Sequence, residues 1–103
     1  MKRGEVRWYK FKPPDKKRPV LILTRTSVID YLGEVTIAPI TSTIRDIPSE
    51  VPLSTVDGMP QECAVNLDHI QTVSKGKIGG LITELSLEKL SYLRQALSFA
   101  LHL

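Results

Sequence analysis

The hydrophobic pattern of the chain changes once, near residue 85. Up to about residue 73 the apolar residues form short runs broken by proline, glycine and polar residues, which is typical of β-strands. We expect strands at 4–11, 20–24, 35–40, 51–53, 63–67 and 70–73. The run at 20–24 is apolar on both faces, so it predicts a strand in the middle of a sheet.

From Leu85 onwards the apolar residues follow a helical period. The stripe consists of Leu87, Leu90, Leu93, Ala96, Leu97, Ala100 and Leu101. Ser86 is a good N-cap for this helix, and Glu88 suits the positive end of the helix dipole. Many short strands followed by one amphipathic helix predict a mainly β (α+β) fold, a small barrel covered on one side.

Proline and glycine mark the expected loops. Pro13 and Pro14 have no amide N–H, so we expect 12–17 to be a mobile surface loop. Pro39 should lie on the edge or at the end of its strand for the same reason. The pair Gly79-Gly80 predicts a turn.

Size and composition exclude several classes of protein. A chain of 103 residues predicts a single domain, 1–103, and Cys63 as the only cysteine excludes an intrachain disulfide and favours the cytoplasm. The longest apolar run has four residues, so no membrane partner is expected. His69 and His102 stand alone, with no metal-ligand spacing, so no metal or other cofactor is expected.

Positive charge is concentrated at the N-terminus. The first 18 residues hold eight Lys/Arg and two acids, for a charge of +6, whereas the rest carries six bases and nine acids. Trp8, Tyr9 and Phe11 lie among these bases, which suits a polyanion with exposed bases. The alternative is a solvated edge strand protected by its charges. Trp8 alternates with Val6, so we expect both on the buried face.

Five blocks of the sequence resemble MazF/PemK-type toxins in the same order. They are KRGEV at 2–6, KRPVLIL at 17–23, APITS at 38–42, VNLDHIQTV at 65–73 and KGKIG at 75–79. The resemblance implies an SH3-like β-barrel with a C-terminal amphipathic helix. It also implies a homodimeric endoribonuclease toxin that cleaves single-stranded RNA without metal and is neutralised by a cognate antitoxin.

The resemblance assigns catalytic roles to two residues. Arg18 matches the arginine that precedes a proline in the family, and its guanidinium is suited to clamp the scissile phosphate. Thr41 matches the threonine of the Ala-Pro-Ile-Thr-Ser block, whose hydroxyl can hydrogen-bond a phosphoryl oxygen. The alternatives are a surface arginine at a strand start and a hydroxyl bonded to nearby backbone.

Six further residues are assigned to RNA binding. They are Lys12, Lys16, Lys17, Ser42, Asp68 and Gln71. The lysines lie in the loop that covers the RNA groove in this family, and Asp68 is placed either to accept from a base edge or to orient Arg18. The segment 68–72 departs from the family's Asp-Gln-Ile-Arg-Thr run, because His69 and Gln71 replace the usual Gln and Arg.

Two other functions remain open at this point. The same barrel serves in the family's gyrase-poisoning branch, which acts on a protein without chemistry. An RNA-binding barrel that has lost cleavage, through changes such as Gln71, is the other alternative.

Overall fold

The computed structural model describes residues 1–13 and 16–103, so Pro14 and Asp15 of the predicted loop lie outside the described residues. The strands are β1 (Glu5–Lys10), β2 (Lys17–Ile22), β3 (Glu34–Thr41), β4 (Glu50–Leu53), β5 (Cys63–Asn66), β6 (Gln71–Ser74) and β7 (Ile78–Glu84). The helices are α1 (Thr26–Ile29) and α2 (Leu87–Leu101), with 3₁₀ turns η1 (Thr55–Asp57), η2 (Leu67–His69) and η3 (Lys75–Lys77).

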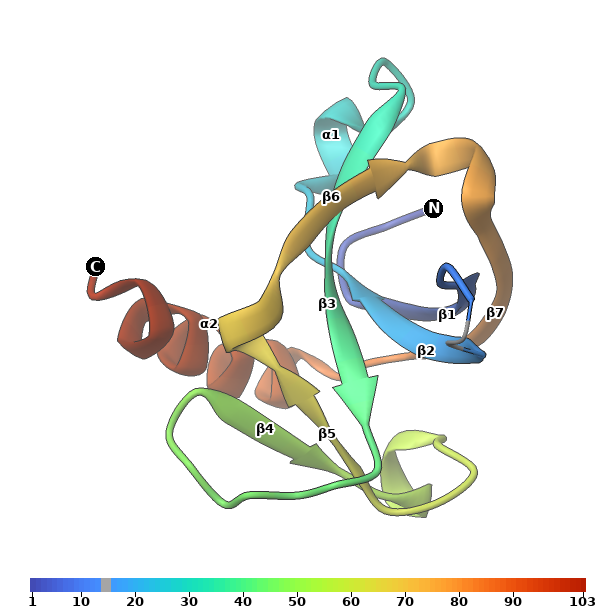
Figure 1. Cartoon of the computed structure of the whole chain (residues 1–103). Coiled ribbons are helices and arrows are strands. Elements are labelled where there is room, and N and C mark those ends of the chain that lie inside the picture. Colours follow the sequence, from blue (N-terminus) through green and yellow to red (C-terminus); the bar gives the residue numbers. More distant parts are fainter. Residues whose placement is uncertain (14–15) are drawn as a thin grey trace.

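The strands form one antiparallel sheet in the order β4-β5-β3-β2-β1-β7, and β6 pairs with β3. Figure 1 shows the strands winding around one another, with α2 to one side beside β4 and η2, which it contacts. The predicted mainly β fold with a C-terminal helix is confirmed. The sheet order ends at β4 and β7, so the barrel is open along that seam.

Strand β3 is the strand that holds the two halves of the sheet together. One of its edges pairs with β2, and the other pairs with β6 near Val35 and with β5 near Thr41. Pro39 was expected on the edge or at the end of its strand; it lies two residues before the end of β3, which has partners on both sides. β5 and β6 pair with the same edge of β3, and the turn η2 separates these two strands. Pro39 lies between the two ladders, at a position where it has no N–H to donate.

The predicted turn at Gly79-Gly80 was also wrong, because both glycines lie inside β7. A Cβ on Gly79 would stand only 3.2 Å from the Trp8 carbonyl oxygen, so the missing side chain lets β7 approach β1. The Gly79 carbonyl accepts a hydrogen bond from Arg7 Nη1 at 3.1 Å. The register between β1 and β7 shifts on either side of Arg7.

Strand β2 explains how the core is divided. Val20, Leu21 and Ile22 are all buried, as predicted for a central strand. Leu21 faces the larger core cluster with Leu93 of α2, while Val20 and Ile22 face a second cluster on the opposite side. Alternating side chains along a strand point to opposite faces, so one strand supplies both clusters.

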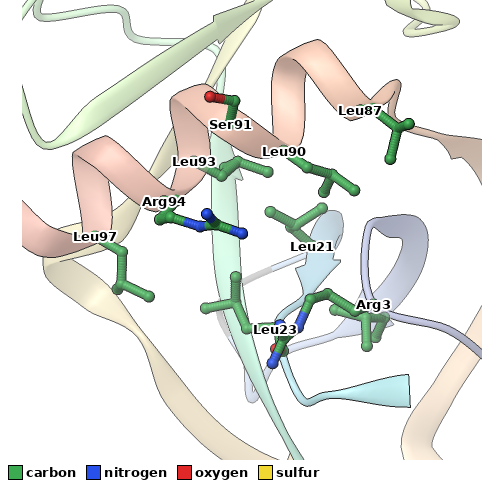
Figure 2. Close-up of a pocket in the computed structure, with 10 residues that line it drawn as sticks. Arg3, Leu21, Leu23, Leu87, Leu90, Ser91, Leu93, Arg94 and Leu97 are labelled. Carbon is green, nitrogen blue, oxygen red and sulfur yellow. The ribbon is translucent and has the colours of Figure 1, made fainter. Parts of the chain in front are cut away.

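Helix α2 closes the larger cluster. Ser86 accepts a hydrogen bond from the Lys89 N–H, which confirms the predicted N-cap. Figure 2 shows Leu90, Leu93 and Leu97 on the helix face that points toward β2. They line a groove of about 370 Å³ together with Arg3 and Arg94, among others. Within the described ranges, no helix is long and apolar enough to cross a membrane.

Gly58 gives a test of the backbone geometry. It ends η1 with φ +92°, and an added Cβ would overlap Thr83 Oγ1, which donates to the Asp57 carbonyl. We expect Gly58→Ala to lower the free energy of unfolding by about 2 kcal/mol or more, measured by urea denaturation. Gly80→Ala is the control, because a Cβ there meets nothing within 4 Å. Equal stabilities of the two variants would contradict this geometry.

Candidate functional site

The pairing of β2 with β3 places Arg18 and Thr41 together. The register pairs Val20 with Pro39, and continuing it by two residues sets Arg18 opposite Thr41. Directly opposed residues of an antiparallel pair have their side chains on the same face of the sheet. Two residues that are 23 positions apart in the chain are therefore neighbours at the end of the ladder.

Two hollows adjoin at this point. One has a volume of about 400 Å³ and the other about 370 Å³, and both are lined by Arg18, Ile40 and Thr41. The first, which we call the lysine hollow, also includes Trp8, Lys16 and Lys17. The second, the amide hollow, also includes Asn66 and Gln71. Arg18 and Thr41 thus stand where the two hollows meet.

Thr41 lies at the last position of β3. Its Oγ1 accepts a hydrogen bond from the Thr43 N–H at 3.1 Å, which was the plain structural alternative for this residue. That bond uses a lone pair of the oxygen and leaves the hydroxyl hydrogen to be donated elsewhere. The backbone contact therefore orients the hydroxyl without removing its capacity to donate.

Arg18 is exposed near the start of β2, where it precedes Pro19. No hydrogen bond or ion pair joins its guanidinium to another of the described residues. A guanidinium keeps its charge at any physiological pH and offers a planar fork of N–H donors. At this position it is suited to bind a tetrahedral oxyanion such as a phosphodiester.

The prediction that Trp8 belongs to the core was wrong. Trp8 is half-buried, and it lines the lysine hollow instead of joining either core cluster. The ammonium of Lys17 lies 5.1 Å from the centre of the Trp8 ring, within cation–π range. In the register of β1 and β2, Trp8 pairs with Pro19, the residue that follows Arg18.

Four of the other RNA-binding candidates line one of the two hollows. Ser42, Lys16 and Lys17 line the lysine hollow, and Gln71 lines the amide hollow. Lys12 is exposed, and neither hollow includes it.

Asp68 points to a different neighbour. It accepts a hydrogen bond from Ser49 Oγ at 2.5 Å, and its N–H donates to Asn66 Oδ1 at 3.0 Å. Among the described residues, no hydrogen bond or ion pair joins Asp68 to Arg18. The neighbours Asn66 and His69 line the amide hollow in its place.

The structure adds residues that the sequence analysis did not assign to catalysis or to RNA binding. Arg45 lines the amide hollow. Phe11, which directly follows β1, lines it too, and its ring packs edge-on against the Tyr9 ring with 4.7 Å between the ring centres. His69 lies exposed in η2 and not inside a strand. The signal for Phe11 was its place among the N-terminal bases, whereas Arg45 stood in a loop without a distinctive local pattern.

Cys63 is the thiol that adjoins the site. Cys63 lines the lysine hollow but is buried, and burial raises the pKa of its thiol, with a further contribution from the Asp57 carboxylate. A raised pKa keeps the thiol protonated and unreactive at neutral pH. Across residues 1–13 and 16–103 there is no cluster of three or more His, Cys, Asp or Glu that is suited to hold a metal ion.

A sequence model for the family described as "PemK-like, MazF-like toxin of type II toxin-antitoxin system" matches residues 2–101. The chain is 48% identical over 65 residues to "Endoribonuclease MazF3" of Mycobacterium tuberculosis, a match that covers 63% of each protein. It is 40% identical over 87 residues to "Probable endoribonuclease MazF2" of the same species, covering 84% of this chain and 83% of the relative.

Solved structures agree with these matches. The "Mycobacterium tuberculosis toxin MazF-mt6" superposes with a TM-score of 0.89 at 37% identity, covering 96% of this chain and 97% of that one. An "Endoribonuclease in complex with its cognate antitoxin from Mycobacterial species" superposes with a TM-score of 0.88 at 26% identity, covering 100% and 96%.

The state of Cys63 can be measured directly. Because burial raises the pKa of its thiol, we expect alkylation by iodoacetamide at pH 7.5 to be roughly ten-fold or more slower in the folded protein than in urea. Mass spectrometry of timed samples gives both rates. Equal rates would show that the thiol is as accessible in the folded protein as in the unfolded chain, which its burial contradicts.

Proposed function

The chain belongs to the PemK-like, MazF-like family of toxins of type II toxin-antitoxin systems, and from this we propose that it is an endoribonuclease toxin that cleaves single-stranded RNA. The observation that carries the proposal is the meeting of Arg18 and Thr41 where the two hollows adjoin. A permanent cation and a hydroxyl donor beside one groove suit a phosphodiester.

Cleavage follows from the chemistry of the RNA itself. The ribose 2′-oxygen attacks the adjacent phosphorus and its proton passes to water, and the bond from phosphorus to the 5′-oxygen breaks as that oxygen takes up a proton from water. The products are a 2′,3′-cyclic phosphate and a 5′-hydroxyl. DNA lacks the 2′-OH and is spared.

The two catalytic candidates act on the phosphate. The Arg18 guanidinium binds the non-bridging oxygens of the phosphate, where negative charge accumulates as the phosphorus becomes five-coordinate. The Thr41 hydroxyl donates a further hydrogen bond to one of these oxygens, while the Thr43 N–H keeps the threonine oxygen in place. Paired strands fix the backbones of both residues, which keeps the two side chains beside the same groove.

The surrounding residues bind the remainder of the RNA. Lys16 and Lys17 attract the backbone in the lysine hollow, with Lys12 adding charge nearby, and Trp8 offers a ring face to a base. Ser42 and Gln71 are suited to read base edges from the two hollows. Asp68 stays close to this set through its hydrogen bond with the Asn66 side chain.

The proposal includes an antitoxin as partner in the cytoplasm. A related structure, 26% identical, is described as an endoribonuclease with its cognate antitoxin. The N-terminal charge of +6 favours an acidic, partly disordered antitoxin segment that competes with RNA for the lysine hollow.

Cleavage is tested with purified protein and a mixed single-stranded RNA in EDTA. We expect fragments that end in 2′,3′-cyclic phosphates, and we expect Arg18→Ala and Thr41→Ala each to slow cleavage by roughly 100-fold or more, because each removes a donor to the developing oxyanion. Arg94→Ala is the control, since Arg94 lies in the groove under α2. Mapping of fragment ends gives products and rates.

The outcomes separate the three candidate functions. Intact RNA with retained, salt-sensitive binding identifies a binding protein without cleavage. Intact RNA without binding, together with trapped gyrase–DNA complexes, identifies a gyrase poison. Either result would overturn the proposal.

A homodimer is part of the proposal, with the RNA groove running along the dimer interface. Phe99, Leu101 and Leu103 near the end of α2 are exposed apolar residues that a second copy would cover. We expect sedimentation equilibrium at micromolar concentration to give twice the 11.5 kDa mass of one chain. The mass of a single chain at that concentration would contradict the dimer.

A further inference from the structure

An ion pair outside the predicted site shapes the amide hollow. Arg45 lies in the segment between β3 and β4, and its Nε stands 3.2 Å from Glu50 Oε2. The Arg45 N–H also donates to Glu50 Oε1 at 2.9 Å. Glu50 therefore holds both the backbone and the side chain of Arg45.

The two partners differ sharply in exposure. The Glu50 side chain is 1% exposed, whereas the Arg45 side chain is 50% exposed. Glu50 Oε2 accepts no hydrogen bond from the described residues, so the guanidinium is its main compensation. The carboxylate is enclosed behind the arginine, and the outer face of the guanidinium is what a ligand in the hollow meets.

The lining of the amide hollow has the charge of an anion site. Arg18 and Arg45 are its two arginines, and the described lining contains no carboxylate. Apart from Thr41 and His69, the other polar groups are the neutral amides of Asn66 and Gln71. Arg45 lines the amide hollow and not the lysine hollow, whereas Arg18 lines both.

We propose that Arg45 binds a backbone phosphate of the RNA next to the scissile one, with Glu50 as the residue that positions it. The inference rests on the proposed function, because the RNA that occupies Arg18 and Thr41 must continue into a neighbouring hollow. With its Nε directed at Glu50, the guanidinium presents its two terminal nitrogens as a fork for phosphate oxygens.

The variants must separate phosphate binding from loop stability. Arg45→Ala alone leaves Glu50 buried without a counter-charge and is expected to destabilise the fold. The double variant Arg45→Gln/Glu50→Gln removes both charges and keeps the loop hydrogen bond from the residue 45 N–H. Arg25→Gln is the matched control, because Arg25 is exposed and lies in neither hollow.

The probe is a 2′-O-methyl RNA oligonucleotide, which cannot be cleaved, and binding is followed by fluorescence anisotropy over a salt series. We expect the double variant to bind roughly ten-fold or more weakly. The slope of log affinity against log salt should fall by about 0.7, the value for one lost contact on a single strand. Cleavage of subsaturating RNA by the double variant should fall by the same roughly ten-fold, whereas Arg25→Gln should cleave at the parental rate.

A neutral methylphosphonate placed at each linkage in turn locates the contact. The parent protein should lose affinity at the scissile linkage and at an adjacent one, and the double variant should be insensitive at the adjacent one only. Glu50→Gln alone should keep the salt slope while binding more weakly, as expected for a positioning residue.

Three results would overturn the inference. A double variant with the parental salt slope and the parental methylphosphonate profile shows that Arg45 does not contact a phosphate. Unchanged or tighter binding by Glu50→Gln removes the positioning role. A parent protein that neither binds the oligonucleotide nor cleaves unmodified RNA refutes the proposed function as well, whereas a parent that binds the oligonucleotide and cleaves unmodified RNA leaves that function standing.

Discussion

The register between β2 and β3 is the constraint on which the candidate site depends. Side chains alternate between faces along a strand, so a slip of one residue would place Arg18 and Thr41 on opposite sides of the sheet. The core prevents such a slip, because Val20 and Ile22 fill one cluster and Leu21 fills the other. The same packing that stabilises the fold therefore brings a cation and a hydroxyl to one groove.

The groove combines groups that differ in how firmly they are held. Arg18 and Thr41 stand at the ends of paired strands, and the Thr43 N–H fixes the threonine oxygen. Lys17 is held against the Trp8 ring, and Arg45 is held by a buried carboxylate that no ligand in the hollow would meet. Each held cation loses little side-chain freedom on binding, which favours affinity for a flexible single strand.

Local pattern was enough to predict most of the elements. Apolar runs located six strands, and leucine spacing with Ser86 located α2, since both signals depend on short-range order. Strand β7 was missed because Gly79-Gly80 favours a turn locally, and only its pairing with β1 makes a strand there favourable. Trp8 was wrongly assigned to the core and Arg45 was missed, because the surroundings of both residues come from segments far away in the chain. Arg18 and Thr41 were selected by family resemblance, and the register then gave a physical reason for their proximity.

The most direct measurement is a crystal structure of the protein with a short 2′-O-methyl RNA. The account predicts the Arg18 guanidinium and the Thr41 hydroxyl within hydrogen-bond distance of non-bridging oxygens of the same phosphodiester. RNA bound elsewhere on the protein, or these two side chains on different phosphates, would contradict it.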